Sequence, residues 1–335
     1  GSPISPVLYS LFIDDMVDDL NGFIGVDSLK LGDRHFCCLL YADDIVLFSS
    51  SYSDLQSLLE ICEIHSLRNR YRFSVRKCEA VLSSVPADRP RPTVYGEQLP
   101  LSDSFVYLGI PISANGIKFK DLCQRNGLKA LQAAHFFKNA GCNGVGFDNY
   151  TCLRIYQAFV RPILEYGLCL CPASIVKKFQ SYAGKCIRLM TSTGKSASAT
   201  ALGLFGEVQP VPVRASTLTF KYCNKTRRKT PAYAVHYALQ AFTARRTTHS
   251  TFAQWSSNNM IRAWDRERFG AQLENRSPVY RPLQEMQDQA IEALTQCHSS
   301  AFIWRGKDRG ERKTLAKAIA SCDRKGQRMI VNWVL

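Results

Sequence analysis

Residues 36–48 constrain the fold of this chain most, because two short apolar runs there flank a pair of carboxylates. The runs, FCCLLYA and IVLF, are rich in strand formers and too short to cross a membrane. They predict a buried β-hairpin whose tip carries Asp43 and Asp44. Aspartate tolerates turn conformations, so an ordinary turn is one interpretation. The other is a site for a hard cation, since two fixed carboxylates suit Mg2+.

The distribution of charge favours a polyanionic ligand. The sequence holds 43 Lys and Arg against 28 Asp and Glu, which gives +15. Residues 1–60 contain ten acids and two bases, or −8, so the rest of the chain carries 41 bases and 18 acids, or +23. This asymmetry predicts a nucleic acid whose phosphates meet a metal at the acidic end. A basic protein with a solvated surface and no such ligand is the alternative.

The length of 335 residues and the apolar content of 46% predict a globular protein of two or three domains. Thirteen cysteines are scattered, mostly inside apolar runs, which is typical of reduced core residues, and their spacing does not match a zinc site. The sequence shows no signal peptide and no long apolar segment. We therefore expect an intracellular protein, nuclear or cytoplasmic, that is neither secreted nor in a membrane.

A capped amphipathic helix is predicted before the hairpin. The chain opens with Ser before Pro, as helix starts do. Apolar residues then follow at helical spacing, namely Ile4, Val7, Leu8, Leu11, Phe12 and Met16. We expect the acidic residues from Asp14 to Asp19 to form the solvated face of this helix.

A second helix is predicted after the hairpin, where residues 53–56 fit a capping box. Its expected buried stripe consists of Leu55, Leu58, Leu59 and Cys62. Prolines at 86, 90 and 92 mark a connector, beyond which residues 94–97 and 105–112 are typical of short strands with glycine turns.

Four blocks within the first 110 residues resemble, in their order, the reverse transcriptases of non-LTR retroelements and their group II intron relatives. GSPISPVLY at residues 1–9 is similar to the loop and helix that support the template and the incoming nucleotide, and YADD at 41–44 matches the metal-binding motif of the family. Lys77 is similar to the lysine thought to protonate the leaving pyrophosphate, although Ser74 stands where the family usually has Asn. The fourth block, Tyr107-Leu108-Gly109, is similar to the primer grip.

This resemblance implies an RNA-directed DNA polymerase that uses two Mg2+ ions for in-line nucleotidyl transfer. Asp43 would be the direct metal ligand and Asp44 the supporting one. Substrate and template would meet Gly1, Ser2, Pro3 and Tyr41. The implied partners are an RNA template with a DNA primer, or an RNA/DNA hybrid, and deoxynucleoside triphosphates.

The resemblance also implies an α+β fold, with a partial reverse transcriptase palm at residues 1–115, which carries the catalytic hairpin, and a helical thumb-like region at 116–190. Helical spacing and interspersed cations from Lys118 onward suit a thumb that follows a duplex backbone. A helical bundle with a solvated basic face is the alternative. Residues 191–335 are expected to be basic and mainly helical, without an assigned role, and residues 305–328 hold nine bases against three acids.

The departure from the family lies at the start of the chain. The first catalytic Asp of the family and its fingers region precede the Gly-Ser-Pro block, and this chain begins at that block with Gly1 rather than Met. We therefore expect a segment upstream and an inactive polypeptide in its absence. A non-catalytic RNA- or DNA-binding protein derived from a retroelement is the alternative interpretation.

Overall fold

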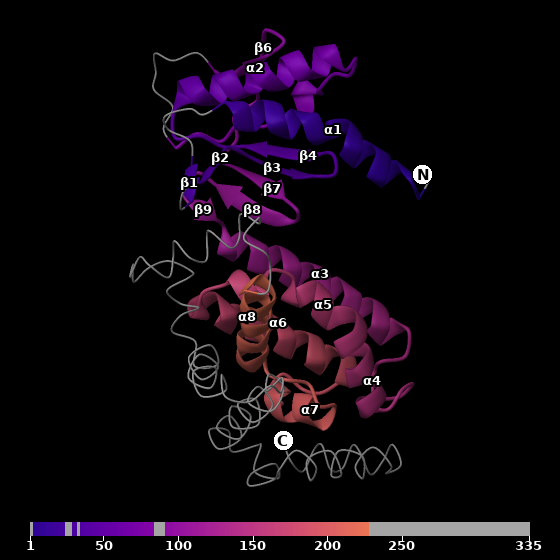
Figure 1. The fold of residues 1–335 in the computed structure, drawn as a ribbon. Coiled ribbons are helices and arrows are strands. Elements are labelled where there is room, and N and C mark those ends of the chain that lie inside the picture. Colours follow the sequence, from indigo (N-terminus) through magenta and orange to yellow (C-terminus); the bar gives the residue numbers. More distant parts are fainter. Residues whose placement is uncertain (1–2, 24–28, 32–33, 84–90, 228–335) are drawn as a thin grey trace, which may run out of the picture. The chain divides into compact units, whose positions relative to one another are not determined.

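The computed structural model describes residues 3–23, 29–31, 34–83 and 91–227 (Figure 1). These residues belong to two compact units, which meet in the sequence between Lys118 and Phe119. No helix in the described ranges combines the length and the apolar character that crossing a bilayer requires.

The first unit combines helices with short antiparallel hairpins, as expected for an α+β fold. Its first part runs α1 (Ser5–Gly22), β1 (Leu29–Leu31), β2 (Arg34–Phe36), β3 (Cys38–Tyr41), β4 (Asp44–Leu47) and α2 (Tyr52–Arg68). A 3-10 turn, η1 (Val75–Lys77), precedes β5 (Thr93–Val94), β6 (Glu97–Gln98), β7 (Ser104–Tyr107), β8 (Ile110–Ser113) and β9 (Gly116–Ile117). The described strands pair as β1-β2, β3-β4, β5-β6 and β7-β8-β9, each pair antiparallel.

The core of this unit lies between the two helices and one face of the β3-β4 hairpin (Figure 1). The fully buried members are Ile13, Met16, Leu20, Cys37, Leu58 and Cys62. Alternate strand residues such as Leu40 and Ile45 pack against them, because successive side chains of a strand face opposite sides. The other face is open in the described residues, where Tyr41 is 62% exposed. The predicted hairpin is confirmed, but it is buried on one face only.

The first predicted helix is confirmed as α1, whereas its predicted cap and buried face are wrong. Ile4 occupies the N-cap position without a side-chain cap bond, and Pro6 lies in the first turn. The buried face consists of Ile13, Met16 and Leu20, and the five apolar residues from Ile4 to Phe12 are exposed. Apolar residues occupy two faces of this helix, so spacing alone did not identify the face that packs.

The second predicted helix is confirmed as α2, but its cap lies two residues earlier than predicted. The hydroxyl of Ser51 accepts a hydrogen bond from the backbone N–H of Asp54 at 3.1 Å. Ser51 therefore supplies the N-cap acceptor. Leu58 and Cys62 are buried as expected, and His65 and Ser66 extend the buried face by another turn.

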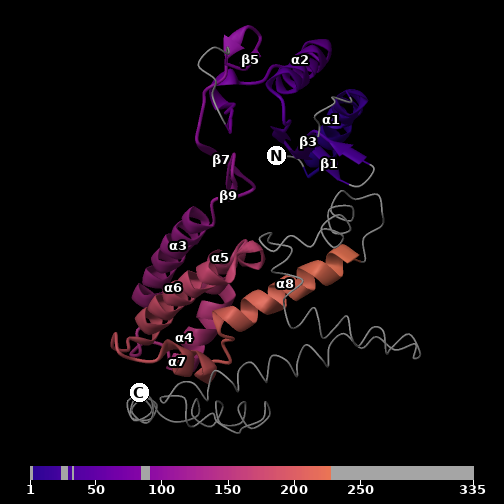
Figure 2. The same cartoon turned by 90° about the vertical axis from the view of Figure 1, so that its left-hand side faces the viewer.

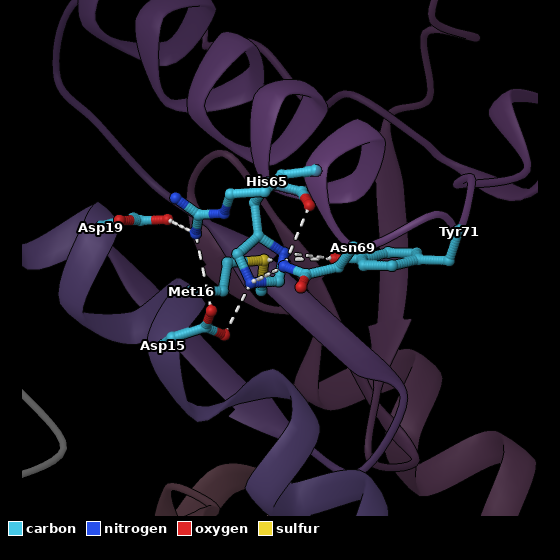
Figure 3. A network of polar contacts seen from close by, with 7 residues as sticks. Asp15, Met16, Asp19, His65, Asn69 and Tyr71 are labelled. Carbon is cyan, nitrogen blue, oxygen red and sulfur yellow. Dashed lines mark hydrogen bonds and ion pairs between the residues drawn. The ribbon is translucent and has the colours of Figure 1, made fainter.

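A polar network fastens α1 to α2 (Figure 3). The buried ring of His65 lies 2.8 Å from Asp15 through Nε2 and 2.8 Å from the hydroxyl of Tyr71 through Nδ1. Beside it, Arg68 donates to Asp19 at 2.6 Å. Asp15 and Asp19 thus link two helices, although their side chains remain exposed to solvent as predicted, at 56% and 37%.

The described part of the second unit is helical throughout. It contains α3 (Phe119–Asn139), α4 (Asn149–Ile155), the π-helical turn η2 (Tyr156–Val160), α5 (Arg161–Glu165) and the 3-10 turn η3 (Leu168–Leu170). It continues with α6 (Ala173–Thr191), α7 (Ala199–Phe205) and α8 (Val211–Arg227). Figure 2 shows α3, α5 and α6 side by side, with α8 crossing α6.

The core of the second unit is centred on α6, whose buried residues include Phe179, Cys186 and Met190. Gly127 lets α3 approach α6 closely, because a Cβ there would lie 2.5 Å from the ring of Tyr182.

The residues from 119 to 227 hold fifteen Lys and Arg against four Asp and Glu, which gives a charge of +11. This unit therefore presents a basic surface around an apolar core.

Candidate functional site

The turn of the β3-β4 hairpin places the paired carboxylates. Tyr41 pairs with Asp44, so Ala42 and Asp43 form the two-residue connection. Ala42 adopts a φ of 51°, which is uncommon for a residue with a Cβ and costs about 1–2 kcal/mol. Such strain persists only where the surrounding structure imposes it, and it is common at functional sites.

Asp43 and Asp44 have exposed side chains that form no hydrogen bond or ion pair with another described residue. Burial, together with the negative charge of Asp43, raises the pKa of Tyr9 on α1. Burial, together with the negative charge of Asp44, raises the pKa of Tyr107 on β7. The two carboxylates therefore act on different tyrosines, as expected for neighbouring residues at the start of a strand.

The chemistry of this tip fits a hard cation. Exposed carboxylate oxygens without a protein partner are the ligands that Mg2+ prefers, and Mg2+ keeps several waters when one or two carboxylates hold it. No cluster of three or more His, Cys, Asp or Glu within the described ranges has a metal-binding arrangement. Asp43 and Asp44 thus provide part of a coordination shell.

The predicted primer-grip residues form a tight hairpin turn between β7 and β8. Tyr107 pairs with Ile110, and the two connecting residues, Leu108 and Gly109, have φ values of 46° and 77°. Positive φ at both central positions matches the twist of the flanking strands. The charge of Asp44 acts on Tyr107, so this turn lies within electrostatic reach of the carboxylates.

The remaining predicted site residues lie apart or outside the described ranges. Lys77 ends η1 with an exposed side chain and forms no ion pair with a described residue. Gly1 and Ser2 lie outside the described residues, as does the basic stretch 305–328. Pro3 is exposed and precedes α1.

Sequence reasoning missed an ionic cluster in the second unit. Glu165 on α5 is 8% exposed and accepts a hydrogen bond from Nε of Arg214 on α8 at 2.9 Å. Nε of Arg161 lies 3.8 Å from the other oxygen of Glu165. The spacing of Arg161 and Glu165 by four residues was a usable signal, but Arg214 lies 49 residues from Glu165, beyond any local pattern.

The comparisons with known proteins agree with the geometry of the first unit. Residues 1–112 match the family described as reverse transcriptase (RNA-dependent DNA polymerase). The chain is also similar to the retrovirus-related Pol polyprotein from type-1 retrotransposable element R2 of Popillia japonica, at 29% identity over 127 residues. This match covers 35% of the chain and spans about a fifth of the relative, 21%. Residues 1–112 are therefore similar to a reverse transcriptase domain, and the match to the R2 polyprotein supports a resemblance to the non-LTR branch of that family.

Proposed function

We propose that the first unit is the palm part of an RNA-directed DNA polymerase of a non-LTR retroelement and that the helical unit acts as its thumb. The observation that carries the proposal is the YADD turn, which has Asp43 at its tip. The charge of Asp43 acts on Tyr9 of the first block, and the charge of Asp44 acts on Tyr107 of the fourth. The strained φ of Ala42 supports it, since a tight turn holds the carboxylates in place.

In this proposal, Asp43 and Asp44 hold Mg2+, which would lower the pKa of the primer 3′-hydroxyl and offset charge on the triphosphate. Lys77 supplies a proton to the leaving pyrophosphate, and its exposed amino group is open to a substrate. Tyr107, Leu108 and Gly109 hold the primer end beside Asp44, while Pro3 and Tyr41 contact the template and the incoming nucleotide. The partners are an RNA template with a DNA primer, or an RNA/DNA hybrid, and deoxynucleoside triphosphates.

We further propose that the polypeptide of 335 residues is inactive by itself. A two-metal centre needs several carboxylates that face the same ions, and the described residues contain no cluster of three or more His, Cys, Asp or Glu that could hold a metal. We propose that a further carboxylate, from the segment that precedes the Gly-Ser-Pro block in the family, completes the metal site.

The test is primer extension on an RNA template with Mg2+. It compares the chain alone, the chain fused to the fingers segment of an R2-type relative, and both forms with Asp43→Ala. Activity in the fusion alone, abolished by Asp43→Ala, is the expected result. Extension by the unfused chain would overturn the proposed inactivity, and extension by the Asp43→Ala fusion would overturn the role of Asp43.

A non-catalytic nucleic-acid-binding protein is the second candidate, and the charge of +11 on residues 119–227 favours it. A fusion that binds RNA tightly, folds and yet never extends a primer would support this candidate over the polymerase.

A further inference from the structure

The second unit contains two arginines that share one buried carboxylate. Arg161 begins α5 and Glu165 ends it, one helical turn later. Arg214 comes from the first turn of α8, whose start is fixed to α6 by a 2.8 Å hydrogen bond from the backbone N–H of Val211 to Gln180. The side chains of Arg161, Arg214 and Glu165 are 18%, 22% and 7% exposed.

The cluster has one more positive than negative charge, and its ionic contacts are incomplete. Nε of Arg161 and Oε1 of Glu165 are buried without a hydrogen-bond partner in the described residues. Burial lowers the pKa of Arg161 and raises that of Glu165, so both charged forms are incompletely stabilised here. The surplus positive charge is only partly exposed to solvent, so an anion that neutralises it would stabilise the cluster.

The terminal amino groups of both arginines are available to such an anion. Every hydrogen bond and ion pair that these side chains form with described residues uses Nε, and the terminal nitrogens are not among the buried atoms that lack a partner. These nitrogens therefore reach solvent, while Glu165 accepts a hydrogen bond from Nε of Arg214 and lies 3.8 Å from Nε of Arg161. The guanidinium of Arg214, held through Nε, presents its fork in one orientation, which suits the paired oxygens of a phosphate, and the charge of Arg161 lies beside it.

We propose that Arg161 and Arg214, positioned by Glu165, form a binding site for a backbone phosphate of a nucleic acid. This inference takes from the proposed function only that the ligand is a nucleic acid, and it does not require the protein to be an active polymerase. The surrounding charge favours the same ligand: exposed Arg154 also acts electrostatically on Arg161, and basic residues outnumber acidic ones across this unit.

The first test measures binding of a labelled RNA/DNA hybrid by the full chain, by fluorescence anisotropy at several salt concentrations and without nucleotides. Arg214→Gln should weaken binding by about tenfold, as loss of a charge-assisted hydrogen bond predicts. It should also reduce the slope of log K against log salt by about 0.7–0.9, the value for one phosphate contact. Arg214→Lys keeps the charge but loses the fork, so it should weaken binding severalfold.

The matched control is Lys221→Gln, which removes one positive charge from the exposed surface of the same helix. If Arg214→Gln weakens binding no more than Lys221→Gln does, the site acts only through diffuse charge and the proposal is wrong. Binding by Arg214→Lys equal to that of the wild type would also contradict it.

A second measurement uses the wild-type chain and does not depend on whether a variant folds. The Nε–H NMR signals of Arg161 and Arg214 should shift when the hybrid is added. Unchanged signals during saturating binding would overturn the proposal, as would shifts caused by inorganic pyrophosphate but not by the hybrid. Neither result would bear on primer extension, so failure here is distinguishable from failure of the proposed polymerase.

Discussion

His65 on α2 is fully buried, and its Nε2 lies 2.8 Å from Oδ1 of Asp15 on α1. A carboxylate only accepts, so Nε2 of His65 donates to Asp15, and Nδ1 lies within hydrogen-bond distance, 2.8 Å, of the Tyr71 hydroxyl. The ring therefore joins α1, α2 and the segment after α2 at one point (Figure 3). Because α1 and α2 support the β3-β4 hairpin, this contact stabilises the platform beneath Asp43 and Asp44.

Removal of the carboxylate at position 15 should destabilise the first unit. Asp15→Ala leaves the buried N–H of His65 without its acceptor, so we expect the melting temperature to fall by several degrees, as measured by circular dichroism. Asp14→Ala is the control, because the exposed side chain of Asp14 has no partner among the described residues. Equal destabilisation by both variants would contradict a specific role for Asp15.

The same contact predicts a pH dependence. The hydrogen bond from His65, aided by the charges of His65 and Arg68, lowers the pKa of Asp15 below its ordinary value of 3.8. A lowered folded-state pKa adds stability above the ordinary value, and this stability is lost as pH falls through the folded pKa. In urea denaturation, the wild type should therefore exceed Asp15→Ala in stability above pH 4, and the difference should shrink below it. A difference that grows on acidification would be inconsistent with this linkage.

Gly127 should resist substitution even though it lies inside a helix. Alanine there would gain up to about 1 kcal/mol of helix propensity. Its Cβ would also lie 2.5 Å from the ring of Tyr182, and such overpacking costs about 1–3 kcal/mol. We expect Gly127→Ala to lower the free energy of unfolding in urea. Gly22→Ala in α1 is the control, since nothing lies within 4 Å of its Cβ, and it should be neutral or stabilising.

The turn between β7 and β8 should tolerate glycine better than valine at position 108. The φ of 46° at Leu108 suits glycine, while a β-branched residue is strained there by about 1–2 kcal/mol. We therefore expect Leu108→Gly to be more stable than Leu108→Val in chemical denaturation. Apolar burial alone would give the opposite order, so a more stable valine variant would show that burial outweighs backbone strain at this turn.

The local sequence predicted the hairpin and the turns correctly, but it did not predict the contacts between distant residues. The tip of the hairpin was located correctly because β-formers stop at two aspartates, and the turns at Gly96 and Gly109 followed from glycine's access to positive φ. The cap of α2 was misplaced because several serines precede that helix and each resembles an N-cap. The bond between His65 and Asp15 spans 50 residues, so no periodicity could have revealed it.

Asp43 and Asp44 should each affect the pKa of a different tyrosine, Tyr9 and Tyr107 respectively. Asp43→Asn removes a negative charge that acts on Tyr9, so the pKa of Tyr9 should fall while that of Tyr107 stays unchanged. Asp44→Asn should lower the pKa of Tyr107 and leave Tyr9 unchanged. Burial is the larger cause at both tyrosines, so each pKa should remain above its ordinary value of 10.0. NMR titration of the tyrosine Cζ signals measures both groups in each variant. If either variant shifted both tyrosines equally, the carboxylates would share one electrostatic environment, and the assignment of each carboxylate to its own tyrosine would be wrong.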